Sequence, residues 1–143
     1  MKKTVKVNGS WQGGYRIDLA AGMHKIIIDQ PPSGGGRDEG PSPLQVFLFA
    51  LGGCLGAVGA IIAKQERIDL RGFDVEIEGD VDYDFLMGKT KEGRAGFTEI
   101  RVVVDIDADM SDEEKQDFLH RIDSRCPISD NMINNTTVKF DLK

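Results

Sequence analysis

One long uncharged segment dominates the hydrophobic pattern of this chain. No charged side chain occurs from Leu44 to Ala63, and Gln45 is its only polar residue apart from the thiol of Cys54. The preceding Ser42-Pro43 is typical of a helix start, because serine is a favoured N-cap and proline suits the first helical position. The charged residues 64–67 follow. The pattern therefore predicts a helix over residues 42–65 that is apolar on every face and needs covering on every face.

Alternating apolar and polar residues predict strands on both sides of this helix. Before it, residues 3–7, 15–19 and 24–29 indicate an antiparallel meander, and the Pro- and Gly-rich residues 30–43 indicate a loop leading into the helix. After it, alternation predicts strands over residues 72–79, 97–107 and 136–142.

Two shorter helices complete the pattern. Ser111 and Glu114 have the spacing of a capping box, and the apolar residues Phe118, Leu119 and Ile122 then recur at helical spacing. Pro127 starts a second short helix through Met132. Strands, a long helix, and then strand-strand-helix-strand predict an α+β fold, with residues 1–143 as one domain.

Composition and charge narrow the possible partners. The chain has 24 acidic and 18 basic residues, a net charge of -6, which argues against nucleic acid or an anionic membrane as a partner. The N-terminus has two lysines without an apolar segment behind them, so we expect no signal peptide and a cytoplasmic protein. Two widely separated cysteines and two histidines predict no metal site.

The uncharged segment also has the length of a membrane span, roughly 20 residues. Its four glycines and the lack of a flanking basic cluster argue instead for a buried helix in a protein without membrane contact. Small residues form one predicted stripe (Gly52, Gly56, Gly59 and Ala63), and Cys54 lies on the opposite face with Phe47, Ala50, Val58 and Ile61. A single small chain has few elements with which to bury both faces of this helix. The pattern therefore favours a homodimer, in which a second subunit covers one face.

The two cysteines allow a structural and a chemical interpretation. Buried cysteine often acts as a small hydrophobic residue. A reactive thiolate needs a nearby cation or helix N-terminus. Cys126 has both, because it precedes Pro127 at a predicted helix start and follows Arg125. The residues alone leave both interpretations open for Cys54 and for Cys126.

Two motifs in this order resemble the OsmC/Ohr family, the osmotically inducible and organic-hydroperoxide-resistance proteins. The first is Gly40-Pro41-Ser42-Pro43-Leu44 running into Ala50-Leu51-Gly52-Gly53-Cys54, and the second is Cys126-Pro127-Ile128-Ser129. The order of the predicted elements fits this family over essentially the whole chain. The resemblance implies the OsmC-like fold, with antiparallel sheets around a long central apolar helix in an intertwined homodimer.

The resemblance also implies a function, that of a thiol-dependent peroxidase. Cys54 is then the peroxidatic cysteine, which reduces a small organic hydroperoxide, and Cys126 is the resolving cysteine. No cofactor is bound, and an external dithiol of the lipoyl type serves as reductant. An apolar face formed by Phe47, Val58 and Ile61 would hold the alkyl group of the substrate.

One position departs from the organic-hydroperoxide-resistance branch. In that branch an arginine activates the cysteine and is held by a glutamate ten residues before it, whereas this chain has Leu44 there. Arg37 and Arg16 are both candidates for the activating arginine, with Arg37 preferred because its loop leads directly into the helix. Two alternatives to the peroxidase therefore stay open. The protein could be a non-enzymatic binding protein for a small apolar ligand at the dimer interface, or a stoichiometric redox sensor.

Overall fold

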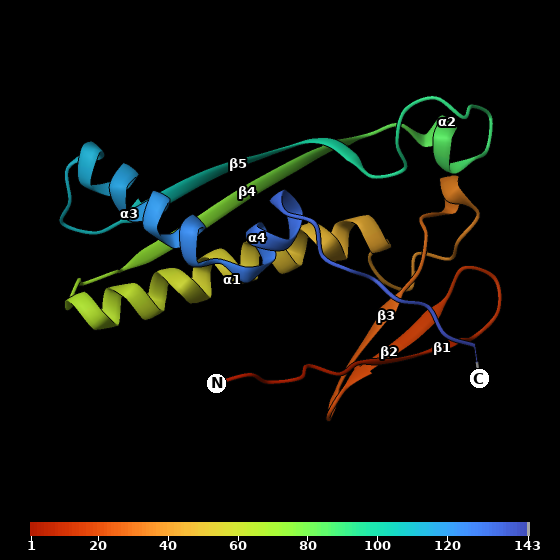
Figure 1. Cartoon of the computed structure of the whole chain (residues 1–143), viewed down its shortest axis with the longest axis horizontal. Coiled ribbons are helices and arrows are strands. Elements are labelled where there is room, and N and C mark those ends of the chain that lie inside the picture. The colour runs from red at the N-terminus through yellow and green to blue at the C-terminus, as the bar shows by residue number, and fades with distance from the viewer. Residues whose placement is uncertain (143) are drawn as a thin grey trace. The chain divides into compact units, whose positions relative to one another are not determined.

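A computed structural model describes residues 1–142 of the chain. The chain forms two compact units, Met1–Phe47 and a second unit that begins at Leu48. Each contains one antiparallel sheet, and the long predicted helix is present (Figure 1). The predicted α+β class is therefore confirmed.

The first unit is a three-stranded meander with the order β1-β2-β3. The strands are β1 (Asn8–Trp11), β2 (Ile17–Ala21) and β3 (His24–Ile28). The prediction of a strand at residues 3–7 is wrong, and the first strand lies further along the chain. The register explains why: Asn8 lies opposite Ala20 and β2 ends at Ala21, so residues 3–6 extend past the end of β2 and have no residue of that strand opposite them.

The loop after β3 contains a short 3₁₀ helix, η1 (Pro32–Gly34), and ends at the start of α1 (Pro43–Glu66). The predicted N-cap is confirmed. The Gln45 backbone N–H donates to Ser42 Oγ at 3.3 Å, and the Ser42 backbone N–H donates to Gln45 Oε1 at 2.8 Å. This reciprocal pair satisfies two backbone donors at the helix start.

The second unit is built on a long hairpin of β4 (Gly72–Val81) and β5 (Phe97–Asp107). The connection between them carries a single helical turn, α2 (Tyr83–Leu86). Helix α3 (Asp112–Arg125) starts at the predicted capping box, where Ser111 Oγ accepts the Glu114 backbone N–H. Helix α4 (Pro127–Ile133) follows after one residue.

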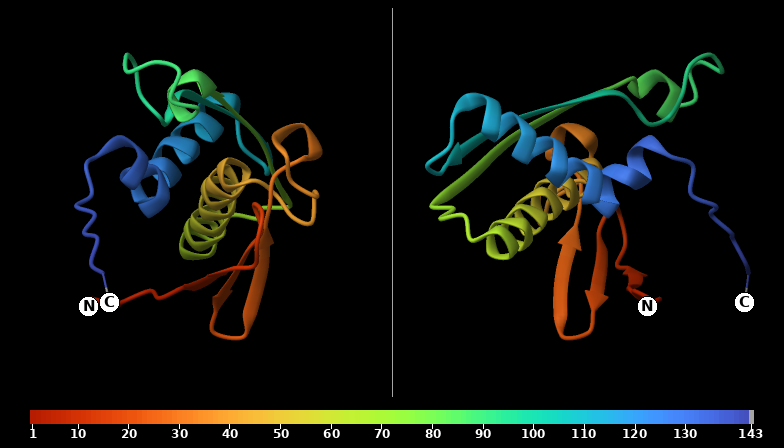
Figure 2. Two further views of the ribbon diagram at one scale, coloured as in Figure 1. Left: turned by 90° about the vertical axis from the view of Figure 1, so that its right-hand side faces the viewer. Right: turned by 60° about the vertical axis from the view of Figure 1, so that its left-hand side comes forward.

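Helix α1 packs its glycine stripe against its own hairpin. A Cβ built on Gly52 would lie 3.2 Å from Val75, and one on Gly59 would lie 3.2 Å from Ile122 and 3.5 Å from Phe73. Figure 2 shows α1 running alongside β4 and β5, with α3 next to it. The predicted stripe of small residues is confirmed, and its partner in this structure is the sheet of the same unit.

The core of the second unit lies where α1, α3 and the hairpin meet. Phe118 and Ile122 of α3 are completely buried. They belong to one apolar cluster with residues from α1, from the end of β5 and the residue after it, and from the α3–α4 junction: Leu51, Leu55, Val58, Ile62, Ala63, Ile106, Ala108 and Cys126.

The prediction of a last strand at residues 136–142 is wrong. These residues are in the described part of the chain but pair with no strand there. Their apolar side chains are exposed, with Val138 at 69% and Phe140 at 93%. Alternation favours a strand, but a strand also needs a neighbour whose backbone groups it can bond.

Helix α1 is long and apolar enough to cross a membrane, with a mean hydropathy of 2.4 over its most apolar 18 residues, of which 33% are buried. A long core helix of a water-soluble protein has the same length and composition. These properties therefore give only weak evidence for a membrane span.

The packing predicts a large difference between two isoleucines. Replacing Ile122 with alanine should lower the free energy of unfolding by about 2–5 kcal/mol, because it leaves a cavity in the core. Ile133, which is 73% exposed, is the matched control, and its replacement should change the stability by less than about 0.5 kcal/mol. Urea denaturation followed by circular dichroism measures both. Equal effects would contradict this description of the core.

Candidate functional site

The two cysteines lie in direct contact. Cys54 is at the middle of α1, and Cys126 is the single residue between α3 and α4, 72 positions later. Their sulfur atoms are 2.8 Å apart, and both are free thiols. A sulfenic acid on one sulfur would therefore meet the other thiol without a movement of the backbone.

The surroundings of Cys126 disfavour its thiolate form. Its side chain is 1% exposed, and burial raises the pKa of its thiol, with the contact to Cys54 acting in the same direction. Backbone N–H groups of Ser129 and Ile128 oppose this rise, the first at 3.4 Å from the sulfur. Burial has the larger effect, so Cys126 donates its S–H hydrogen to the sulfur of Cys54.

The helix places Cys54 at the border of an open face. The glycine stripe of α1 lies against the hairpin, while Leu51 and Leu55 are buried in the core. The remaining third of the helix in this unit is open, with Phe49 at 64% and Ile61 at 49% exposure. Cys54 itself is partly buried, so its sulfur is more accessible than that of Cys126.

A pocket of about 260 Å³ is lined by residues that neighbour the two cysteines, although neither cysteine is among its lining residues. Its wall includes Ser129, whose backbone N–H donates to the Cys126 sulfur. It also includes Leu51 and Leu55, which lie within one turn of Cys54 on α1. The rest of its wall combines apolar and polar side chains from β5 and α3: Val102, Leu119, Gln116, His120 and Asp123.

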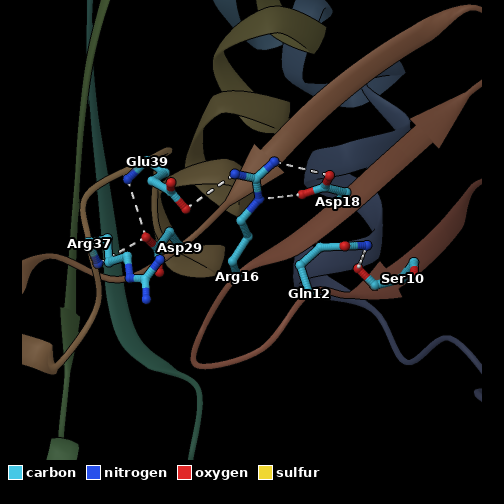
Figure 3. Close-up of polar contacts among 7 residues, drawn as sticks. All are labelled: Ser10, Gln12, Arg16, Asp18, Asp29, Arg37 and Glu39. Atoms are coloured by element: carbon cyan, nitrogen blue, oxygen red, sulfur yellow. Dashed lines mark hydrogen bonds and ion pairs between the residues drawn. The ribbon is translucent and has the colours of Figure 1, made fainter.

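The first candidate arginine, Arg16, is held by two carboxylates within the first unit. Its guanidinium donates to Asp18 at 2.7 and 3.1 Å and to Glu39 at 3.3 Å (Figure 3). These partners, Asp18 first, raise the pKa of Arg16 above its ordinary value, and Arg16 in turn lowers the pKa of Asp18. The guanidinium is therefore permanently charged and fixed in orientation.

The second candidate, Arg37, is positioned through its backbone. Its N–H donates to Asp29 Oδ2 at 3.0 Å, and the Glu39 N–H donates to the same oxygen at 3.2 Å. Within the described part of the chain the Arg37 side chain forms no ion pair, and it lies next to Asp29 in Figure 3. Both arginines line a polar pocket of about 420 Å³ in the first unit, together with Tyr15 and Gln12.

Asp29 organises this loop. Its side chain is buried, and the Gln30 backbone amide lowers the pKa of its carboxyl below the usual range. Desolvation opposes this effect, and the amides of Glu39 and Arg37 reinforce it. A buried carboxylate with several amide donors holds the loop in one conformation.

The residues predicted to bind an apolar ligand are found in different surroundings. Val58 is 8% exposed and belongs to the core, whereas Phe47 is 44% and Ile61 49% exposed. Their contact with a ligand stays a prediction. The described residues contain no group of three or more potential metal ligands.

Some residues of the site were not singled out by sequence reasoning. Asp29, Glu39, Asp123 and Ser129 all hold other site residues in place. Two of them had a visible signal, because Asp29 ends an apolar strand and Ser129 is part of the Cys-Pro-Ile-Ser motif. Asp18 lies two residues after Arg16, on the same face of the strand predicted at residues 15–19. Glu39 is 23 positions away, and only folding brings it to Arg16.

Comparisons with known proteins identify the family of this chain. A family model described as OsmC-like protein matches residues 35–141. The chain belongs to the OsmC-like protein family. No curated protein matches it significantly.

Solved structures show the same fold at low sequence identity. An OsmC-like protein from Mycoplasma pneumoniae is 20% identical, with a TM-score of 0.80 over 93% of this chain and 89% of that chain. An organic hydroperoxide resistance protein from Elizabethkingia anophelis is 19% identical, with a TM-score of 0.72 over 94% and 91%. One from Bacillus subtilis is 24% identical, with a TM-score of 0.61 over 99% and 98%. The OsmC-like fold is therefore shown.

The loop of this OsmC-like protein should be sensitive to acid through Asp29. The folded-state pKa of Asp29 is lowered, so its contribution to stability is present above the unfolded-state value, about 3.9, and is lost as the pH falls through the folded-state value. Asp29→Asn should therefore destabilise the protein at pH 7, and the difference from wild type should shrink below about pH 4.

Urea unfolding at a series of pH values measures this difference. Asp38→Asn is the matched control, because Asp38 lies in the same loop and asparagine tolerates its positive φ of 58°. A difference for Asp29→Asn that stays constant down to acidic pH would contradict a role for the charged carboxylate.

Proposed function

We propose that this protein is a thiol-dependent peroxidase that reduces organic hydroperoxides through Cys54 and Cys126. The observation that supports this function best is the contact of 2.8 Å between the two sulfur atoms. Membership of the OsmC-like family adds support, since solved structures with this fold include organic hydroperoxide resistance proteins.

The reaction begins at the more accessible sulfur. The Cys54 thiolate attacks one oxygen of the hydroperoxide, the O–O bond breaks, and the alkoxide leaves and takes up a proton as an alcohol. Cys54 is then a sulfenic acid. The Cys126 sulfur next attacks the Cys54 sulfur, and the hydroxyl group leaves with the Cys126 proton as water. An external dithiol, which we propose to be of the lipoyl type, reduces the disulfide and is itself oxidised.

The substrate class follows from the apolar surroundings of Cys54. Leu51 and Leu55 flank it on α1 and line the neighbouring pocket with Val102 and Leu119. Burial of an alkyl group contributes roughly 0.8 kcal/mol per methylene, so organic hydroperoxides should be preferred over hydrogen peroxide. The exposed Phe47 and Ile61 extend the apolar surface that a substrate could use.

We propose Arg16 or Arg37 as the arginine that activates the thiol. Leu44 supplies no carboxylate, but Asp18 and Glu39 hold Arg16 in the way that a glutamate of the helix would. This arrangement makes Arg16 a stronger candidate than the sequence alone indicates. Arg37, which forms no ion pair within the described residues, remains the alternative activating group.

We also propose a cytoplasmic homodimer. The open face of α1 exposes Phe49 and Ile61 around the small residues Gly53, Ala57 and Ala60. An apolar helix face of this kind is typical of a surface between subunits. No resident cofactor, metal, nucleic acid or membrane is needed for the proposed chemistry.

A steady-state assay with cumene hydroperoxide and dihydrolipoamide tests the function. Wild type should turn over, and Cys54→Ser should reduce the rate to background because it removes the nucleophile. Cys126→Ser should still consume about one equivalent of hydroperoxide but lose turnover. Hydrogen peroxide should give a lower kcat/KM than cumene hydroperoxide.

The same assay separates the alternatives. Consumption of one equivalent by wild type without turnover would instead support a stoichiometric redox sensor, which the thiol contact also permits. If wild type and Cys54→Ser were indistinguishable, the peroxidase function would be excluded. A retained apolar molecule in native mass spectrometry would then favour the binding protein.

The dimer has a separate test. Light scattering should give about twice the chain mass of 15.7 kDa. Ala57→Glu should shift this mass toward the monomer, because it places a charge on the open face of α1. Ala95→Glu, at an exposed position of the β4–β5 connection, is the matched control and should leave the mass unchanged. A monomeric wild type would contradict the proposal.

A further inference from the structure

The position of Cys126 depends on a junction of only one residue. Helix α3 ends at Arg125 and α4 begins at Pro127, so Cys126 is both the C-cap of the first helix and the N-cap of the second. Helix α4 has seven residues and is too short to be stable by itself. Contacts that fix the junction therefore fix the distance between the two sulfur atoms.

Two side chains surround this junction. The Ser129 hydroxyl donates to Asp123 Oδ1 in a short hydrogen bond that links α4 back to α3. Each partner also contacts Cys126 through its backbone: the Ser129 N–H donates to the sulfur at 3.4 Å, and the Asp123 carbonyl accepts the Cys126 N–H at 3.1 Å. Ser129 is 7% exposed, so water competes little for its hydroxyl.

We propose that Asp123 and Ser129 are positioning residues that hold the Cys126 thiol against Cys54 and so set how readily the disulfide forms. This inference rests on the proposed function, in which Cys126 resolves the Cys54 sulfenic acid. The physical reason is proximity. A thiol held in contact with its partner reacts as if it were highly concentrated, and a freely moving junction loses that advantage.

Equilibration with reduced and oxidised dithiothreitol measures the effect without hydroperoxide. The Cys54–Cys126 disulfide is quantified by alkylation and intact-mass spectrometry. Ser129→Ala and Asp123→Ala should each lower the equilibrium constant for this disulfide by about tenfold, since each removes a hydrogen bond to a charged group. Ser129→Thr keeps the hydroxyl and should restore a value close to wild type.

Ser124→Ala is the matched control. The Ser124 hydroxyl lies on the same helix but donates to the Arg121 carbonyl, so its removal should change the equilibrium constant by less than twofold. Asp123→Asn keeps an acceptor oxygen and provides a second, milder variant should Ser129→Ala fail to fold. Circular dichroism and thermal melting establish that the variants compared are folded.

The outcomes distinguish the inference from the function. An unchanged equilibrium constant in folded Ser129→Ala or Asp123→Ala, or a wild type that forms no Cys54–Cys126 disulfide, would overturn the inference. The two assays can also give different answers. If the alanine variants lower the equilibrium constant for the disulfide tenfold, but cumene hydroperoxide does not oxidise Cys54 of the wild type, the positioning role is supported and the peroxidase function is rejected. With hydroperoxide, the folded alanine variants should also accumulate more dimedone-trapped sulfenic acid than wild type.

Discussion

The second unit depends on the close approach of α1 to its hairpin. Gly52 and Gly59 allow Val75 and Phe73 to pack against the helix backbone, where a Cβ would already lie within 3.2 to 3.5 Å of its neighbours. Larger side chains there would move α1 outward and separate Ile122 of α3 from the core. The glycine stripe can face only the sheet. This fixes the distance of α1 from the hairpin and the rotation of the helix about its own axis.

This fixed rotation determines what Cys54 can do. The thiol lies opposite the glycine stripe, away from the sheet, and between the buried Leu51 and Leu55 on one side and the open helix face on the other. From that position it meets Cys126 at the α3–α4 junction. Burial raises the pKa of the Cys126 thiol, which donates a hydrogen bond to the more accessible sulfur of Cys54. The two thiols therefore differ in surroundings although they are in contact.

Local patterns in the sequence predict much of this arrangement. Three predicted features depend only on residues close together in the sequence, and the structure contains all of them: the helix start at Ser42-Pro43, the Ser111 capping box and the strand at 97–107. The strands expected at residues 3–7 and 136–142 fail because a strand also depends on a partner, which alternation does not reveal. The contact of Cys54 with Cys126 joins residues 72 positions apart and depends on how α3 packs against α1. Here the family resemblance suggests the pair, while the spacing of the cysteines by itself does not.

The carboxylate partners of Arg16 differ in position from the one that the family resemblance indicates. Leu44 removes the helix carboxylate expected of the organic-hydroperoxide-resistance branch, yet Arg16 still has two carboxylate partners, Asp18 in β2 and Glu39 in the loop. Glu39 reaches Arg16 because Asp29 binds the loop backbone at Arg37 and Glu39. An arginine needs only an oriented acceptor of opposite charge, whichever element supplies it. With Leu44 in the helix, Arg16 therefore still has two charged partners, and both of them lie outside α1.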